Sequence, residues 1–393
     1  MNGKERLLAA ITGKHVDRPP IWLREGFNIG GPIQLEPMGD VLGEGGDAEF
    51  TSNWKLEPIY KELFEFVSPH VDAMRGWDIG GYINRFLMIP PQYIKRRVNQ
   101  IDKNTINING TVETPKGTLT FQDQLKRGFN TYWHIEHLVK STEDLKKLAD
   151  IPFEFDPEVL LPYIESYQQK KEDLGDRGIM RIEYPSPIVA VSATMELEDF
   201  LAFSVMEKEL LHELLEEITR RLLVITDALF GKNNLETLVN FGGSEQCTPP
   251  LMSPLAFDEF IVPYDGKIIA KLKEYGISAS MHCHGKVRHA LECMIEMEVD
   301  STDPVEPPPA GDVTFAEARE ITQGKLTLIG NLEFDELENQ QPEYIDKRIR
   351  EILSHGSDRL VLGASAGPIH ALTPRIAANY KSWINAYLAH IGN

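Results

Sequence analysis

The sequence predicts an α/β protein with the fold of a (β/α)8 barrel. Short apolar runs rich in β-branched residues alternate with longer stretches of helical periodicity, which is the pattern of repeated strand–helix units. There are eight such runs, the number that closes a parallel barrel, and an open doubly wound sheet is the alternative for the same pattern. The predicted strands are Pro20–Arg24, Val71–Trp77, Gly178–Tyr184, Leu238–Gly242, Ile277–His282, Val299–Ser301, Leu326–Gly330 and Leu360–Gly363.

Length and composition are those of an ordinary globular protein. A chain of 393 residues, of which 42% are hydrophobic and 25% charged, suits a single barrel domain over residues 1–393. The net charge of −20 argues against nucleic acid and anionic membranes as partners, because both would be repelled. Three cysteines in so long a chain offer no disulfide framework and predict a cytoplasmic protein. No apolar run approaches the ~20 residues that a membrane-spanning helix needs.

Several helices can be placed from their apolar periodicity. Met1–Gly13 is predicted to be an amphipathic helix, and Pro254–Tyr275 carries apolar residues every three or four positions up to a stop at Gly276. Further helices are predicted at Val287–Met297, Phe315–Thr322, Pro342–His355 and Pro374–His390.

Two segments are longer than a minimal barrel requires. Residues 26–51 are rich in glycine and aperiodic, so we expect a loop over the mouth of the barrel. Residues 80–152 form a predicted insertion after the second strand, and insertions at that end of a barrel shape its mouth. Within this insertion Thr105–Val112 and Gly117–Gln124 alternate in polarity around a Thr-Pro-Lys-Gly turn, which predicts a β-hairpin.

Two histidines stand at the predicted end of the fifth strand, in Ser-Met-His-Cys-His-Gly. Alternate side chains of extended chain share a face, so His282 and His284 can point together into the barrel mouth while Cys283 faces away. Two imidazoles so placed form half of a zinc site, and Glu245, just past the fourth strand, is the predicted third ligand. Cys247 is a competing soft ligand, and both histidines could instead be structural hydrogen bonders.

Two more strand ends carry polar residues. The proline-rich loop Asp303–Pro309 follows the sixth strand, and its Glu306 is a preorganised carboxylate suited to general acid–base work or substrate orientation. Asn331 follows the seventh strand, where its amide could bind substrate. The structural alternatives are a solvated acid on a stiff turn and a turn asparagine.

Four residues near the first two strands complete the predicted site. Arg24 could bind a substrate carboxylate through two hydrogen bonds, with Glu25 beside it as a further substrate contact, or Arg24 could pair with Glu25 or another acid. Trp77 offers a stacking surface for substrate. Asp78 offers a catalytic carboxylate, whose pKa burial would raise, or else a helix N-cap.

Short motifs along nearly the whole chain carry a family resemblance. They are Lys4–Leu8, Asp17–Trp22, Ser253-Pro254, Phe257, Pro263-Tyr264, His282–Gly285, Asp303–Pro309 and Ile329–Glu333. In these motifs the chain resembles the uroporphyrinogen decarboxylase superfamily, which includes corrinoid-linked methyltransferases. The resemblance implies a (β/α)8 barrel with its active site at the carboxyl ends of the strands.

The resemblance implies different residues for the two branches of that superfamily. The methyltransferase branch holds zinc on a His-x-Cys pair and on a cysteine near the last strand. Here His282 matches the histidine, His284 replaces the first cysteine, and the second is missing near Ala366. These losses shift the expected ligands toward histidine and carboxylate, with His370 in reserve. Of the decarboxylase branch's arginine-rich segment only Arg24 is present, with Asp78 as a counterpart of its aspartate.

These observations predict a corrinoid-dependent methyltransferase. It would demethylate a small methylated compound, such as an aryl methyl ether (O-demethylation) or a methylamine, onto a corrinoid protein, with the help of zinc. The alternative is a metal-free decarboxylase of a small carboxylic acid that uses Arg24 and Asp78. A third possibility, from another class, is a catalytically silent protein that binds a ligand in the barrel.

Overall fold

Eight parallel strands form one curved sheet that nearly closes on itself. The computed structural model describes residues 1–24, 27, 57–77, 79, 89–127, 129, 132–368 and 370–392. Hydrogen-bonded neighbours follow the order β1-β12-β11-β10-β9-β8-β7-β2. The strands are β1 (Ile21–Trp22), β2 (Ala73–Gly76), β7 (Gly178–Pro185), β8 (Thr237–Gly242), β9 (Ser278–His282), β10 (Ser301–Asp303), β11 (Thr327–Leu332) and β12 (Leu360–Ala364).

The two edge strands, β1 and β2, meet through one residue. The backbone N–H of Asp72 donates to the carbonyl of Ile21 at 2.8 Å, and the N–H of Ile21 donates back to the Asp72 carboxylate at 3.2 Å. The barrel is therefore closed, except that no continuous ladder of backbone hydrogen bonds joins the described strands β1 and β2. The prediction of eight parallel strands, and with it the (β/α)8 class, is confirmed.

One predicted strand is displaced. Val299–Ser301 was expected, whereas β10 begins at Ser301 and ends at Asp303. The strand consists of Ser, Thr and Asp, because it contributes polar side chains to the barrel, and apolar patterning does not detect such a strand.

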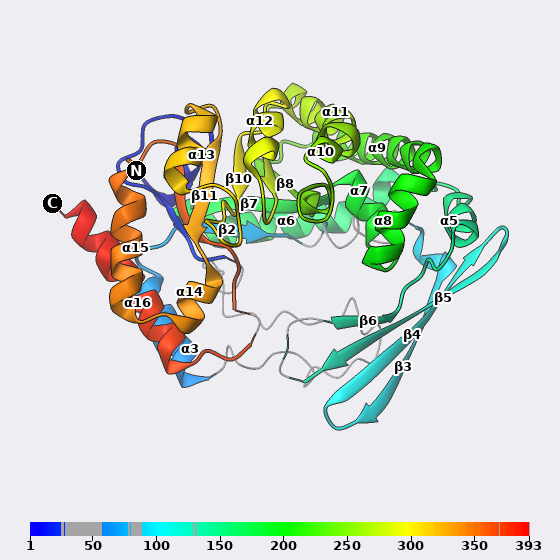
Figure 1. Ribbon diagram of the computed structural model, residues 1–393, viewed down its shortest axis with the longest axis horizontal. Helices are drawn as coiled ribbons and strands as arrows, with labels where there is room; N and C mark the ends of the chain where they lie inside the picture. The colour runs from blue at the N-terminus through cyan, green and yellow to red at the C-terminus, as the bar shows by residue number, and fades with distance from the viewer. Residues whose placement is uncertain are drawn as a thin grey trace.

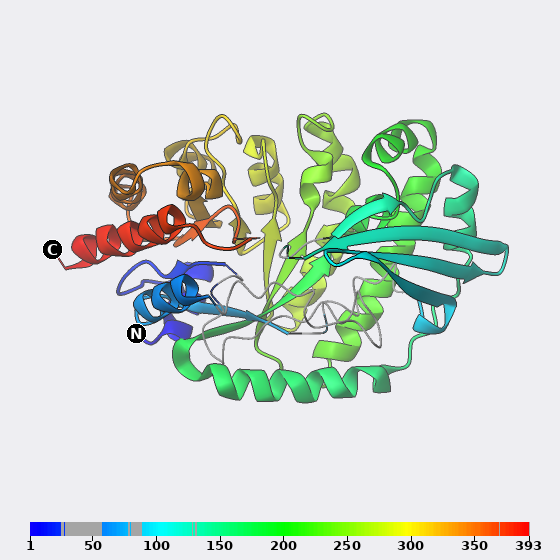
Figure 2. The same ribbon diagram turned by 90° about the horizontal axis from the view of Figure 1, so that it is seen from below.

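Helices surround the sheet (Figures 1 and 2). Among the described residues, none of these helices is long and apolar enough to cross a bilayer. The helices are α1 (Gly3–Ile11), α3 (Pro58–Val67), α5 (Thr142–Ala149), α6 (Leu161–Leu174), α7 (Pro187–Ser192), α8 (Leu197–Met206), α9 (Lys208–Phe230), α10 (Leu255–Phe260), α11 (Val262–Glu274), α12 (Arg288–Glu296), α13 (Phe315–Thr322), α14 (Phe334–Asn339), α15 (Pro342–Ser354) and α16 (Pro374–Ile391), with short 3-10 turns η5 (Pro91–Tyr93), η6 (Pro157–Leu160), η7 (Gly175–Arg177) and η8 (Ser244–Cys247).

The predicted helix Pro254–Tyr275 is wrong as a single element. It divides at Ile261 into α10 and α11, and Ile261 has φ −107° and ψ −59°. Pro263 has no N–H to donate to a carbonyl in the preceding turn, so it begins a new helix rather than continuing the old one. The predicted stop is correct, since Gly276 adopts φ +69° in the left-handed region where glycine is favoured.

The interior of the barrel changes from apolar to polar along the strands. At the amino ends of the strands, α1 covers the barrel and packs into an apolar cluster with strand residues. This cluster consists of Leu7, Ala9, Ala10, Ile11, Val16, Trp22, Met74, Ile179, Leu238, Ile329 and Val361. Toward the carboxyl ends the buried side chains include Arg24, Asn240, Asp303 and Asn331. The charged end is the end at which barrel enzymes carry their active sites.

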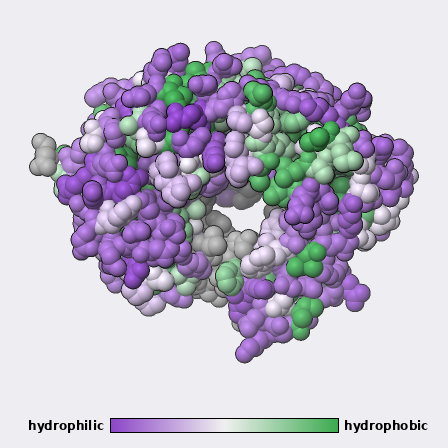
Figure 3. Space-filling view, in the orientation of Figure 1, coloured by the Kyte–Doolittle hydropathy of each residue, from purple (hydrophilic) through white to green (hydrophobic). Residues whose placement is uncertain are grey.

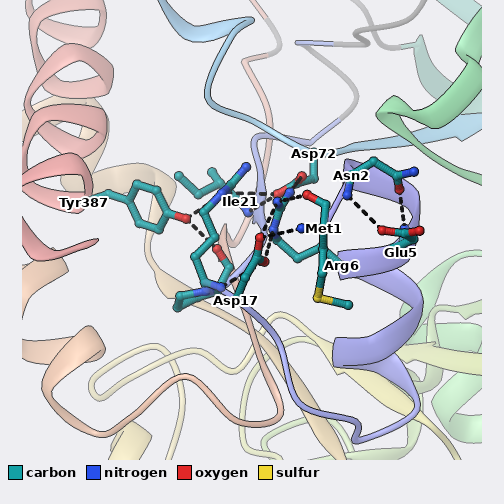
Figure 4. A network of polar contacts seen from close by, with 10 residues as sticks. Met1, Asn2, Glu5, Arg6, Asp17, Ile21, Asp72 and Tyr387 are labelled. Atoms are coloured by element: carbon teal, nitrogen blue, oxygen red, sulfur yellow. Dashed lines mark hydrogen bonds and ion pairs between the residues drawn. The ribbon is translucent and has the colours of Figure 1, made fainter. Parts of the chain in front are cut away.

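A network of charges fastens α1 to the amino end of the barrel (Figure 4). Arg6 pairs with the buried carboxylate of Asp72 at 2.6 Å and with Asp17 at 2.8 Å. Arg18 contacts Asp72 from a second side at 3.3 Å, and it also donates to the hydroxyl of Tyr387 in α16 at 2.7 Å. These contacts tie β1, β2 and the last helix together at the point where the sheet closes.

The insertion after β2 contains a four-stranded antiparallel sheet. The predicted hairpin is present as β4 (Thr105–Thr114) and β5 (Gly117–Lys126), and β3 (Ile94–Asp102) and β6 (Tyr132–Glu136) extend it on either side. This sheet lies on the opposite side of the molecule from α15 and α16 in both ribbon views (Figures 1 and 2). The face in Figure 3 is hollowed at its centre, between the barrel and the sheet. Except for Phe27, the predicted loop 26–51 lies outside the described residues.

Candidate active site at the carboxyl ends of the strands

His282 and His284 come together where β9 ends. Their ring centroids are 4.6 Å apart with the ring planes at 86°. The His282 side chain is 23% exposed and that of His284 36%, so both rings are within reach of solvent. Cys283 between them is buried in the hydrophobic core, as the alternation of extended chain predicts. The two imidazoles therefore share one face of the chain.

Each imidazole is anchored by a carboxylate through its Nδ1. The Oδ2 of Asp303 lies 2.9 Å from Nδ1 of His282, and the Oε1 of Glu306 lies 2.6 Å from Nδ1 of His284. A carboxylate at one ring nitrogen fixes the neutral tautomer that has its lone pair on the other, which is the usual support of metal-binding histidines. Within the described part of the chain neither Nε2 has a hydrogen-bond partner.

Glu306 is held as an anion. Its second oxygen accepts the N–H of Gly285 at 2.6 Å, and Gly285 itself adopts φ +80°. Burial alone would raise the pKa of Glu306, but the hydrogen bonds from His284 and Gly285 outweigh it and lower the pKa. For His284 burial opposes the charged form, while Glu306 and then Glu245 raise its pKa. Glu306, which was predicted as a catalytic acid or base, thus binds His284 and orients its ring.

Arg24 is paired with an acid inside the protein, and its contact with a substrate carboxylate stays a prediction. Its side chain is 4% exposed, and its guanidinium pairs with Asp303 at 2.5 Å. The remaining donors reach the carbonyls of Ala364 and Ser365, both at 2.8 Å. Burial opposes the charge of Asp303, but Arg24 and His282 hold the pKa of that carboxyl well below its usual range. Arg24 has the predicted alternative role, that of pairing with an acid.

Asn331 and Trp77 are also buried and make their contacts within the protein. Asn331 is 2% exposed, its amide donates to the carbonyl of Val305, and its Oδ1 accepts from Arg348 at 3.2 Å. Trp77 is buried with its ring 5.0 Å from that of Tyr167. Asn331 secures the loop after β10, and Trp77 belongs to the core; the substrate contacts expected of both residues stay predictions.

Glu245 and Glu333 each bring a carboxylate oxygen without a partner. Oε2 of Glu245, in η8, and Oε1 of Glu333, directly after β11, are buried, and neither has a hydrogen-bond partner among the described residues. Burial, then the charge of Glu306, raises the pKa of Glu333 to about 7. Sequence reasoning missed the role of Glu333, although its position at a strand end was a usable signal.

The donors available at this site fit a divalent metal. Imidazole nitrogens and orphaned carboxylate oxygens are ligands that Zn²⁺ accepts. The predicted set of His282, His284 and Glu245 is not drawn together, however, because the described residues contain only one group of three ligand atoms within 4.8 Å of one another, and it lies elsewhere. Binding would require Glu245 or another carboxylate to move toward the two rings.

Four other predicted residues lie outside this group. Glu25 and Asp78 lie outside the described residues. His370, the reserve ligand, is paired through Nε2 with Glu338 at 2.7 Å. Cys247 is buried in the hydrophobic core, and burial raises its thiol pKa far above the usual range.

The architecture and the site define a (β/α)8 barrel protein with a histidine- and carboxylate-rich centre at its catalytic end. Residues 130–378 match the family described as uroporphyrinogen decarboxylase (URO-D). The chain belongs to this family. Among curated protein sequences no match to the chain was found.

Similarity to solved structures is at low sequence identity. A methyltransferase from Methanosarcina mazei is 18% identical, with 99% of each chain covered and a TM-score of 0.60. A B12-independent methionine synthase from Shewanella sp. W3-18-1, in complex with selenomethionine, is 10% identical over 95% of each chain, with a TM-score of 0.44. The first likeness supports the overall fold, and the second is too distant to carry an argument.

Proposed function

We propose that this protein is a metal-assisted methyltransferase that demethylates a small methylated substrate. The observation that carries the proposal is the pair of imidazoles at the end of β9, each anchored through Nδ1 and each with a free Nε2 among the described residues. Such anchoring through the second ring nitrogen is the usual support of metal-binding histidines.

His282 and His284 would hold the metal, with Glu245 as the third ligand. The orphaned oxygen of Glu245 supports this assignment, and Glu333 offers a second oxygen of the same kind. When bound, Zn²⁺ would supply Lewis-acid polarisation of the atom that loses the methyl group. Asp303 and Glu306 are then positioning residues, since they orient the two rings and do not reach the substrate.

The leaving oxygen or nitrogen must take up a proton as the methyl group departs. Glu333 is suited to donate it, because a carboxyl group with a pKa of about 7 still carries a proton in a large fraction of molecules at neutral pH. Asp78, which was predicted for a similar task, and Glu25, as a substrate contact, stay predictions.

The methyl acceptor in this proposal is a corrinoid carried by a separate protein. Methyl transfer needs the methyl carbon in line between the leaving atom and the acceptor, so the acceptor must reach the open end of the barrel. The superfamily resemblance and the fold likeness to a methyltransferase support this acceptor. The family match is compatible with the metal-free decarboxylase, but the geometry favours it less, because Arg24, which would bind its carboxylate, is paired with Asp303.

The experiment supplies zinc-loaded protein with chemically reduced cobalamin and a panel of aryl methyl ethers and methylamines. We expect methylcobalamin to form with one class of substrate, and the His282→Ala variant to lose this activity. His370→Ala is the matched control, since that histidine pairs with Glu338 instead. Release of carbon dioxide from a carboxylic acid at an undiminished rate under strong chelation, without methyl transfer from any member of the panel, would overturn the proposal.

A further inference from the structure

Three potential metal ligands meet on the outside of the barrel, on two neighbouring helices. Asp258 belongs to α10, and His289 and Cys293 belong to α12. The spacing of four residues puts His289 and Cys293 on one face of α12, one turn apart. The helices α10 and α12 pack side by side (Figure 1). Asp258 faces the pair from the neighbouring helix.

The three side chains already lie close together. Nε2 of His289 is 2.6 Å from Oδ2 of Asp258, and Sγ of Cys293 is 3.6 Å both from Oδ1 of Asp258 and from Nε2 of His289. Bonds of 2.3 Å to sulfur and 2.0–2.1 Å to nitrogen or oxygen at a tetrahedral angle put sulfur about 3.5 Å from each other ligand. The two sulfur distances therefore match those of a tetrahedral zinc site, while the 2.6 Å between Nε2 and Oδ2 is a hydrogen bond that a bound metal ion would replace. Among the described residues this is the only group of three such ligand atoms within 4.8 Å of one another.

We propose that Asp258, His289 and Cys293 form a second metal site, which binds Zn²⁺ and clips α10 to α12. Zinc is the metal indicated, because thiolate, imidazole and carboxylate together are ligands that it binds readily. The site is separate from the pair of histidines at the barrel mouth, and the inference does not depend on the proposed function.

The surroundings leave room for a fourth ligand. The side chains of Asp258 and His289 are 46% and 34% exposed, so water can complete the coordination. Cys293 is buried beneath them and presents its sulfur from the protein side. Glu292 lies 3.8 Å from the other ring nitrogen of His289, where a carboxylate can help to orient the ring.

The alternative is a surface ion pair between Asp258 and His289, with Cys293 as an inert core residue. Burial, then the charge of Asp258, raises the pKa of the Cys293 thiol to about 12, so the thiol keeps its proton while no metal is bound. Binding would release that proton to solvent, and the apparent affinity of the site would then rise with pH. An ion pair alone predicts no uptake of metal.

A metal ion at this second site would link two segments that lead from the barrel mouth. The helix α10 follows η8, which carries Glu245, and α12 begins four residues after His284. Metal at this site would therefore restrain the outer ends of both segments and stabilise the fold by binding only the folded state.

The test uses the full chain with His282→Ala and His284→Ala, which removes the histidines of the barrel site. After reconstitution and desalting we expect one zinc equivalent per chain, and Co²⁺ should give a thiolate-to-metal charge-transfer band. Adding Cys293→Ser should abolish both signals. Cys247→Ser, the matched control at another buried cysteine, should leave both unchanged.

Two further variants keep the test decisive if Cys293→Ser fails to fold. Asp258→Asn and His289→Gln alter half-exposed side chains, and each should weaken zinc binding by about tenfold or more while the circular dichroism spectrum is retained. Absence of zinc from the folded double-alanine protein, or its persistence after Cys293→Ser, would overturn the proposal. If Cys293→Ser does not fold, unchanged zinc affinity in both Asp258→Asn and His289→Gln would also overturn the proposal.

Discussion

Glu306→Gln tests the orientation of His284 with a change of one atom. The substitution preserves the size of the side chain but removes its charge and one of its two acceptor oxygens. Glu306 now accepts from His284 at 2.6 Å and from the N–H of Gly285 at 2.6 Å, and its lowered pKa keeps it ionised at neutral pH. The amide can satisfy only one of these donors, and its NH2 group faces the other.

The expected cost follows from that loss. A hydrogen bond to a charged group contributes about 1.5–3 kcal/mol, and carboxylates that orient metal-binding histidines typically change metal affinity about 10–100-fold. We therefore expect zinc affinity at the barrel site to fall by about 10–100-fold, measured by competition with a chromophoric chelator in a Cys293→Ser background. Glu317→Gln is the control, because Glu317 also accepts a backbone N–H, that of Thr314, together with side-chain donors from Thr314 and Arg288, but it caps α13 away from the site. Equal affinities for wild type and Glu306→Gln would refute the reasoning.

Two predictions concern stability. Arg24→Gln leaves the buried carboxylate of Asp303 without its guanidinium partner and should cost about 3–5 kcal/mol of unfolding free energy in urea titrations; an unchanged midpoint would contradict this. Asp265 is buried, with a hydrogen bond from Ser186 at 2.9 Å, and burial raises its pKa to about 8. The folded state therefore holds this proton more tightly than the unfolded state, and the stability that it contributes is full below about pH 4 and lost as the pH rises toward 8. Asp265→Asn should remove this dependence on pH. The free energy of unfolding of the variant relative to wild type should therefore rise with pH, by up to about 1.4 kcal/mol per pH unit. Parallel curves of stability against pH for the two proteins would contradict the prediction.

The fold could be predicted because its signals are local. Most barrel strands contain an apolar run, with β9 and β10 as exceptions, and each barrel strand is separated from the next by at least one helix, so alternation along the chain was enough. The break between α10 and α11 was missed because apolar periodicity continues across Pro263, and only the absent N–H of the proline interrupts the helix.

The site was predictable where strand geometry alone decides it. The alternation of extended chain brings His282 and His284 together whatever their partners are. The partner of Arg24 could not be found in the same way, because Asp303 is remote in sequence and meets it only across the closed barrel. Likewise, nothing local distinguishes an amide that is free for substrate from one that is already satisfied, as Asn331 is. Glu333 was not singled out, because nothing local in the sequence shows that its carboxylate is buried with one oxygen orphaned.

Elemental analysis of the purified, desalted protein tests the central claim most directly. In the Cys293→Ser background, which removes the outer site, the chain should retain one metal equivalent. The further change His282→Ala should reduce that content to background while the fold is preserved. Metal at full stoichiometry after loss of His282, or none in its presence despite reconstitution with zinc, would contradict the account of the paired imidazoles as a metal-binding centre.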